Sequence, residues 1–107
     1  MKLFSQRELL EAYAYAREGG QALHVISGRF GHAPGAPGVF LRNQGEMAHL
    51  IDHDIERLLC TAKLLGVRVL KVDRAGRVGQ HVDLVGKPLA RARDLCATPE
   101  LDLFSAR

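Results

Sequence analysis

Histidine and aspartate occur together in one short run of this chain, Gln80-His81-Val82-Asp83-Leu84. In an extended strand, successive side chains point to opposite faces of the sheet. His81 and Asp83 should therefore share one face, while Val82 and Leu84 occupy the other. An imidazole beside a carboxylate can transfer protons, hold a metal ion or bind phosphate. The same pair can equally belong to an ordinary solvated sheet face.

The neighbouring residues extend this polar face. A hairpin whose loop has an odd number of residues places Leu70 and Val72 of a preceding strand with the apolar residues of the run. Burial favours this register because it sorts the large apolar side chains onto a single face. The opposite face then carries Lys71 and Asp73 beside the histidine and the aspartate. His49, from a further predicted strand, joins the same face if its strand lies nearby.

Two kinds of chemistry are open to these side chains. His49, His81 and Asp83 are candidate ligands of a divalent metal ion, since imidazole and carboxylate suit Zn, Mn or Fe. Their spacing is not a zinc signature, because the chain has neither HExxH nor paired CxxC motifs. Alternatively, Asp83 orients His81 as a general base and Lys71 stabilises a phosphate or a developing negative charge.

Three classes of function follow from this face. The first is a metal- or histidine-dependent hydrolase that acts on a phosphorylated or nucleic-acid substrate. The second is a protein that binds such a ligand without chemistry. The third is a structural or oligomeric protein whose polar face is simply hydrated.

The elements that must position these residues are readable from their periodicity and caps. A capping box at residues 5–8 starts a first helix, and a second helix is expected to follow Asp52 as its N-cap. A third helix begins near Pro88. Strands are predicted at residues 22–26, 39–41, 47–51, 67–72 and 80–84, with a Gly/Pro-rich loop at 31–38.

These elements predict an α+β fold. We expect a mixed sheet of about five strands with three helices packed mainly on one face. Strands 47–51 and 67–72 with the helix between them form a predicted βαβ unit, so they should be parallel.

The bulk properties indicate one soluble domain over residues 1–97 and a tail over residues 98–107. The chain of 107 residues is 47% hydrophobic and 25% charged. It has no apolar run approaching the ~20 residues of a membrane span and no signal-peptide core at its start. Cys60 and Cys96 lack CxxC spacing and are expected to be reduced core thiols, which favours a cytoplasmic location. The net charge of +3 allows a polyanionic partner.

The segment from residue 47 to residue 96 resembles a small family of bacterial and phage domains of unknown function. The family pattern is a strand with His and then Asp, a helix, a Leu-Gly-Val turn and a His-x-Asp strand, here His49-Leu50-Ile51-Asp52, Leu65-Gly66-Val67 and His81-Val82-Asp83. The chain differs from the family in lacking tryptophan and in having Val82 where an aromatic residue is common. The resemblance implies that the His-x-Asp face matters and that His49 belongs to it, without naming its chemistry.

The C-terminal run Glu100-Leu101-Asp102-Leu103-Phe104 resembles the bacterial sliding-clamp-binding pentapeptide. The resemblance implies that Leu101, Leu103 and Phe104 fill apolar pockets of a clamp, which would make the protein an accessory of DNA replication or repair. Terminal segments often carry such motifs. Alternatively, these side chains fold back onto the core or form a homo-oligomer contact.

Overall fold

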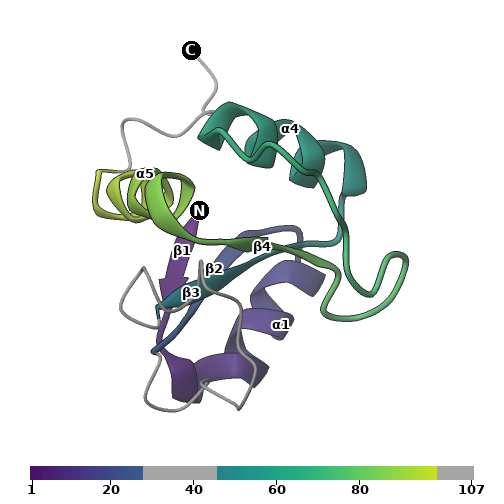
Figure 1. The fold of residues 1–107 in the computed structure, drawn as a ribbon. Helices are drawn as coiled ribbons and strands as arrows, with labels where there is room; N and C mark the ends of the chain where they lie inside the picture. Colours follow the sequence, from purple (N-terminus) through teal and green to yellow (C-terminus); the bar gives the residue numbers. More distant parts are fainter. Residues whose placement is uncertain (28–45, 99–107) are drawn as a thin grey trace, which may run out of the picture.

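The computed structural model describes residues 1–27 and 46–98, and within them it has the predicted α+β fold (Figure 1). The strands are β1 (Lys2–Phe4), β2 (Gln21–Ile26), β3 (Met47–Asp52) and β4 (His81–Leu84). The helices are α1 (Leu9–Arg17), which follows a 3-10 turn η1 (Gln6–Glu8), α4 (Ile55–Leu65) and α5 (Gly86–Ala97). The described part thus has four strands where about five were expected. The predicted strand 39–41 and loop 31–38 lie outside the described residues.

The strands form one mixed sheet in the order β1-β2-β3-β4. β1 and β2 are parallel, whereas β2 with β3 and β3 with β4 are antiparallel. The parallel pair is joined through η1 and α1, so the fold has its βαβ connection at the N-terminus. The prediction of a βαβ unit over residues 47–72 is wrong, because β4 and not residues 67–72 lies beside β3.

Residues 67–72 form no strand and do not lie beside β3, whose two hydrogen-bonding edges are taken by β2 and β4. Just after this segment, Asp73 forms an isolated antiparallel bridge with His81 of β4. Val69 and Leu70 are consequently 81% and 41% exposed, so the expected burial of Leu70 is also wrong. Val72 does pack against the core.

Helices pack against both faces of the sheet (Figure 1). α4 and α5 cover one face, and the largest side chains of this layer are fully buried, among them Leu23, Leu50, Leu58, Val82 and Leu84. α1 covers part of the other face with the cluster Phe4, Ala12, Ala16, Ala22 and Ile51. Two of the three helices therefore lie on one face, and α1 leaves the rest of the second face for polar residues.

The connection between β3 and α4 differs from the prediction in the residue that caps the helix. Asp54, not Asp52, is the N-cap of α4, and its side chain accepts a hydrogen bond from the Arg57 amide. Asp52 still belongs to the strand, where it pairs with Gln21 of β2, and it is fully buried. Its carboxylate accepts hydrogen bonds from the Arg57 side chain and from the Asp54 amide. These hydrogen bonds to Asp52 tie the end of β3 to the first turn of α4.

Cys60 and Cys96 are both free thiols, as expected, but Cys60 is exposed on α4 and only Cys96 packs against the core.

None of the helices in the described ranges is long and apolar enough to cross a membrane.

Candidate metal centre

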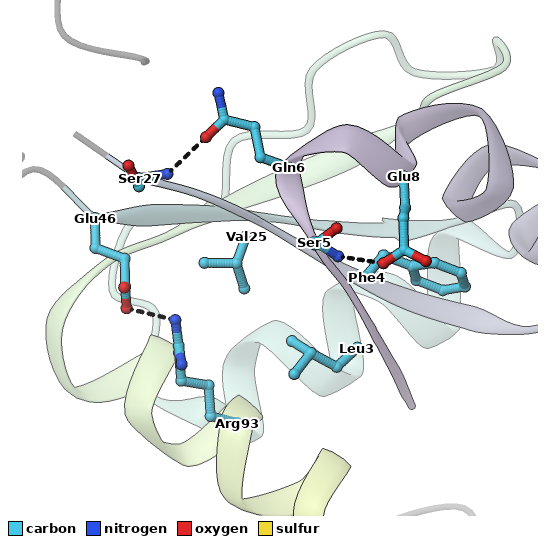
Figure 2. Close-up of a pocket in the computed structure, with 9 residues that line it drawn as sticks. All are labelled: Leu3, Phe4, Ser5, Gln6, Glu8, Val25, Ser27, Glu46 and Arg93. Atoms are coloured by element: carbon cyan, nitrogen blue, oxygen red, sulfur yellow. Dashed lines mark hydrogen bonds and ion pairs between the residues drawn. The ribbon is translucent and has the colours of Figure 1, made fainter. Parts of the chain in front are cut away.

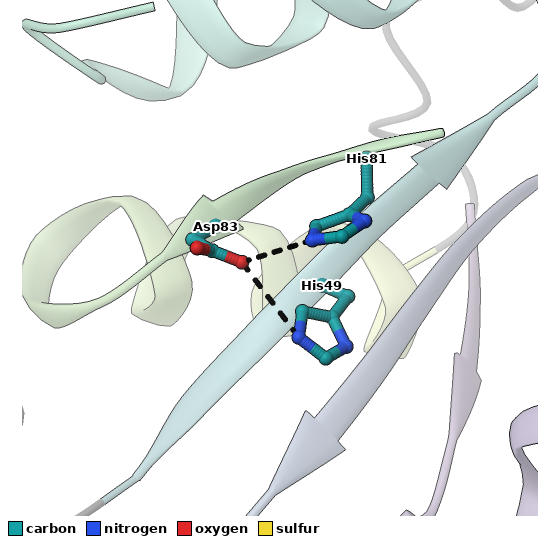
Figure 3. A group of neighbouring side chains, drawn as sticks. All are labelled: His49, His81 and Asp83. Carbon is teal, nitrogen blue, oxygen red and sulfur yellow. Dashed lines mark ion pairs between the residues drawn. The ribbon is translucent and has the colours of Figure 1, made fainter. Parts of the chain in front are cut away.

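A cluster of two histidines and one aspartate lies on the sheet face that α4 and α5 do not cover (Figure 3). His49 comes from β3, and His81 and Asp83 come from β4. The alternation expected for β4 is present, since Val82 and Leu84 are buried in the opposite layer. We call His49, His81 and Asp83 the triad.

The ladder between β3 and β4 brings the triad together. His49 is the direct partner of Asp83, and His81 stands one diagonal step away, opposite Ile51. The Nε2 atom of His81 lies 3.3 Å from Oδ1 of Asp83, and Nε2 of His49 lies 3.7 Å from the same oxygen. One ligand atom from each triad residue lies within 4.8 Å of the other two. Each imidazole thus points its Nε2 atom at the carboxylate of Asp83 (Figure 3).

The orientation of His81 is fixed from its other side. Nδ1 of His81 lies 2.7 Å from the carbonyl oxygen of Gly79, which can only accept a hydrogen bond. Nδ1 therefore carries a proton, and Nε2 is the nitrogen that remains for the triad. Gly79 adopts a φ of +84°, a conformation that glycine enters without steric cost.

The charges around His81 favour its protonated form in the metal-free protein. Burial lowers the pKa of His81, but the hydrogen bond to Asp83, the bond to the Gly79 carbonyl and the charges of Asp83 and Asp73 outweigh it. The net effect raises the pKa of His81 above its ordinary value of 6.5. The same hydrogen bond from His81 lowers the pKa of Asp83 in spite of partial burial.

His49 has the opposite character. Burial disfavours its charged form and the neighbouring positive charge of His81 adds to this, which lowers the pKa of His49 to about 4. At neutral pH His49 is therefore an uncharged imidazole, the form that binds metal ions.

Two further residues predicted from the sequence lie at the margin of the triad. Oδ2 of Asp73 is 3.7 Å from Nε2 of His81, and its Oδ1 is 3.7 Å from Nζ of Lys71. The Lys71 side chain is 80% exposed. Lys71 thus lies next to Asp73 at the rim, whereas the predicted ligands converge in the centre.

His24 is the member of this neighbourhood that the sequence did not connect to it. It stands opposite His49 in the β2–β3 ladder and is buried. The planes of the His24 and His49 rings are nearly parallel, 16° apart, with centroids at 5.6 Å. The residue that His24 meets on the neighbouring strand depends on the strand order, which no local sequence pattern fixes.

A separate cavity of about 440 Å³ borders the edge strand β1 and the side of α5 (Figure 2). Its apolar wall is formed by Leu3, Phe4 and Val25. Polar groups around it are paired with each other: Gln6 Oε1 accepts a hydrogen bond from the Ser27 amide, and Arg93 lies 2.8 Å from Glu46. No triad residue lines this cavity. The triad, whose polar atoms converge on one point, is the stronger candidate site.

The predicted partner-binding residues Leu101, Leu103 and Phe104 lie outside the described residues. Comparisons with protein-family models, with curated proteins and with solved structures find no match to this chain. The resemblance of residues 47–96 to a domain family and that of the C-terminal run to a clamp-binding motif therefore stay predictions.

Proposed function

We propose that the triad binds one divalent transition-metal ion through Nε2 of His49, Nε2 of His81 and the carboxylate of Asp83. The observation that carries this proposal is the approach of both Nε2 atoms to one carboxylate oxygen, at 3.3 and 3.7 Å. Two ligands of a tetrahedral zinc ion, with bonds of about 2.1 Å, lie roughly 3.4 Å apart. The triad therefore needs only small side-chain movements to close around an ion.

The donor set narrows the choice of metal. Two imidazoles and one carboxylate suit Zn²⁺, Fe²⁺ or Mn²⁺ better than the all-oxygen ions Ca²⁺ and Mg²⁺. Three protein ligands leave at least one coordination position open, which is typical of catalytic sites rather than structural ones. The triad also remains accessible, since the Asp83 and His49 side chains are 47% and 24% exposed.

The reaction class that such a site supports best is hydrolysis. A bound divalent ion supplies Lewis acidity and activates water for attack on a polarised ester. The exposed ammonium of Lys71 at the rim and the net charge of +3 favour an anionic substrate such as a phosphate ester or a nucleic acid. We therefore infer a metal-dependent hydrolase of phosphorylated substrates.

The metal site is tested by titrating the metal-stripped protein with Zn²⁺ in a calorimeter. We expect one ion per chain, and at least tenfold weaker binding for His81→Ala and for Asp83→Asn. His53→Ala is the matched control, because His53 is exposed and lies outside the triad. Equal Zn²⁺ affinity in wild type and His81→Ala, or no binding to the wild type, would refute the proposal.

The hydrolase assignment has its own assay. Hydrolysis of bis(p-nitrophenyl) phosphate by the zinc- or manganese-loaded protein should be lost in His49→Ala. Lys71→Ala should raise KM, whereas Lys63→Ala, an exposed lysine on α4, should leave KM unchanged. A metal-loaded protein with no activity on any phosphodiester or phosphomonoester would show a binding role instead.

A further inference from the structure

A third histidine lies next to the triad, on the neighbouring strand β2. His24 on β2 is only 2% exposed and is the ladder partner of His49. The Nδ1 atoms of the two rings lie 3.4 Å apart, and Nε2 of His24 lies 3.0 Å from the carbonyl oxygen of Gln6. Both nitrogens of His24 thus have a hydrogen-bond partner within the protein.

The partners of His24 determine the direction of these hydrogen bonds. The Gln6 carbonyl can only accept, so the proton of a neutral His24 must lie on Nε2. Nδ1 of His24 is then a lone pair without a proton. A hydrogen bond between the two Nδ1 atoms requires His49 to be the donor, with its own proton on Nδ1. Nε2 of His49 is left unprotonated and faces Asp83.

We propose that His24 is a positioning residue that sets the tautomer of His49 and thereby makes its Nε2 available as a metal ligand. Histidine ligands generally donate their second ring N–H to a hydrogen-bond acceptor, which fixes the ring and raises its basicity. For His81 the Gly79 carbonyl has this role. For His49 the role falls to an imidazole, which in turn is held by the Gln6 carbonyl.

Hydrogen bonds hold the backbone segment that carries the Gln6 carbonyl in place. Gln6 begins the 3-10 turn η1, and its side-chain Oε1 accepts a hydrogen bond from the amide of Ser27 just after β2. The neighbouring turn is closed by the Ser5 amide, which donates to Glu8 at 2.8 Å. We call the hydrogen-bonded series from the Gln6 carbonyl through His24 to His49 the relay. This inference rests on the proposed metal site for its purpose, but its geometry exists without metal.

The test reads the tautomer of His49 in the metal-free protein at pH 8 by long-range ¹H–¹⁵N correlation of the histidine rings. Wild type is expected to show His49 with its proton on Nδ1 and His24 with its proton on Nε2. His24→Phe removes the acceptor and should shift His49 toward the Nε2–H form. His24→Asn places an amide oxygen near the position of Nδ1 and should restore the wild-type tautomer. His53→Phe is the control and should change nothing.

Zinc titration of the same variants gives the second readout. We expect His24→Phe to bind Zn²⁺ about 10- to 100-fold more weakly than wild type, and His24→Asn to recover most of that loss. A wild-type His49 with its proton on Nε2, or an unchanged tautomer in His24→Phe, would overturn the inference. If the wild-type tautomers are as expected but no Zn²⁺ binds, the relay stands and the proposed metal function fails. The wild-type spectrum decides the matter even if His24→Phe does not fold.

Discussion

The rings of His49 and His81 meet, with centroids 4.4 Å apart, although the two residues are not partners in the ladder. His49 stands opposite Asp83, and His81 reaches it along the diagonal, where long side chains of neighbouring strands come within contact. Two imidazoles this close do not both accept a proton readily, because each positive charge lowers the pKa of the other ring. Burial and the charge of His81 keep His49 neutral, whereas the hydrogen bond to Asp83 favours the charged form of His81.

The metal-free protein should therefore show two well-separated histidine titrations. We expect His49 to become protonated only near pH 4, because burial and the charge of His81 lower its pKa. His81 should titrate above pH 6.5, because Asp83 and the Gly79 carbonyl stabilise its charged form against the cost of burial. Carbon-detected NMR of the ring Cε1 resonances, after removal of metal with a chelator, measures both. A common midpoint, or the reverse order, would contradict this arrangement.

Neutralising Asp83 should lower the pKa of His81. In Asp83→Asn the burial of His81 is no longer offset by the hydrogen bond and charge of the carboxylate, so its pKa falls from the raised wild-type value. Asp73→Asn should produce a smaller decrease in the same direction, because Asp73 acts on His81 only through its charge at 3.7 Å. The same NMR titration measures both changes.

The matched control for this comparison is Glu11→Gln, which removes one exposed carboxylate from α1. An equal decrease in the pKa of His81 in this variant would mean that net charge, and not the contact with Asp83, sets the value.

Part of this site was predictable from the sequence because alternation along a strand is a local property. It placed His81 and Asp83 on one face and Val82 on the other, and it offered His49 as a ligand. The convergence of these residues depends on β4 lying beside β3, and no local pattern fixes strand order. For the same reason His24 could not be connected to His49 from the sequence.

Residues 67–72 are a case in which the local sequence pattern predicts a strand that the structure does not have. Their β-branched alternation predicts a strand, since β propensity measures how well a residue fits a half-buried pleated surface. In this fold no free edge of β3 is left for them, and Val69 is exposed instead. A strong local preference is therefore overridden by the pairing of β3 with β4.

The turn before β4 should be sensitive to the size of the residue at position 79. Gly79→Ala strains a backbone at φ +84° and places a Cβ 3.1 Å from the Tyr13 ring and hydroxyl. Gly76→Ala imposes comparable strain at φ +76° but meets no atom within 4 Å. We expect Gly76→Ala to lower the free energy of unfolding by about 1 kcal/mol, the cost of a left-handed alanine, and Gly79→Ala to lower it further.

Only the substitution at position 79 should also disturb the metal site, since the Gly79 carbonyl holds Nδ1 of His81. Urea unfolding of the metal-free variants and Zn²⁺ titration of the folded ones separate the two effects. Equal Zn²⁺ affinities for Gly79→Ala and Gly76→Ala would show that the turn does not position His81.

The ion pair at the end of β3 should contribute much more to stability than the one near α5. Asp52 is fully buried, and its two carboxylate oxygens lie 2.6 and 2.8 Å from the guanidinium of Arg57. Arg57→Met leaves this carboxylate buried without its counter-charge, which should lower the free energy of unfolding by about 3 kcal/mol. Arg93→Met breaks an ion pair with Glu46 whose side chains are both about 40% exposed, and should cost about 1 kcal/mol or less.

Urea unfolding followed by circular dichroism measures both losses. The loss in Arg57→Met arises mainly from the uncompensated charge of Asp52, so adding Asp52→Asn to Arg57→Met should recover part of the stability. The neutral amide retains an oxygen that can accept from the Asp54 amide, as Oδ1 of Asp52 does. Further loss in the double variant would show that the carboxylate remains well stabilised by its hydrogen bonds alone. The stability lost in Arg57→Met would then arise from the hydrogen bonds that Arg57 donates to the Gly19 and Gly20 carbonyls.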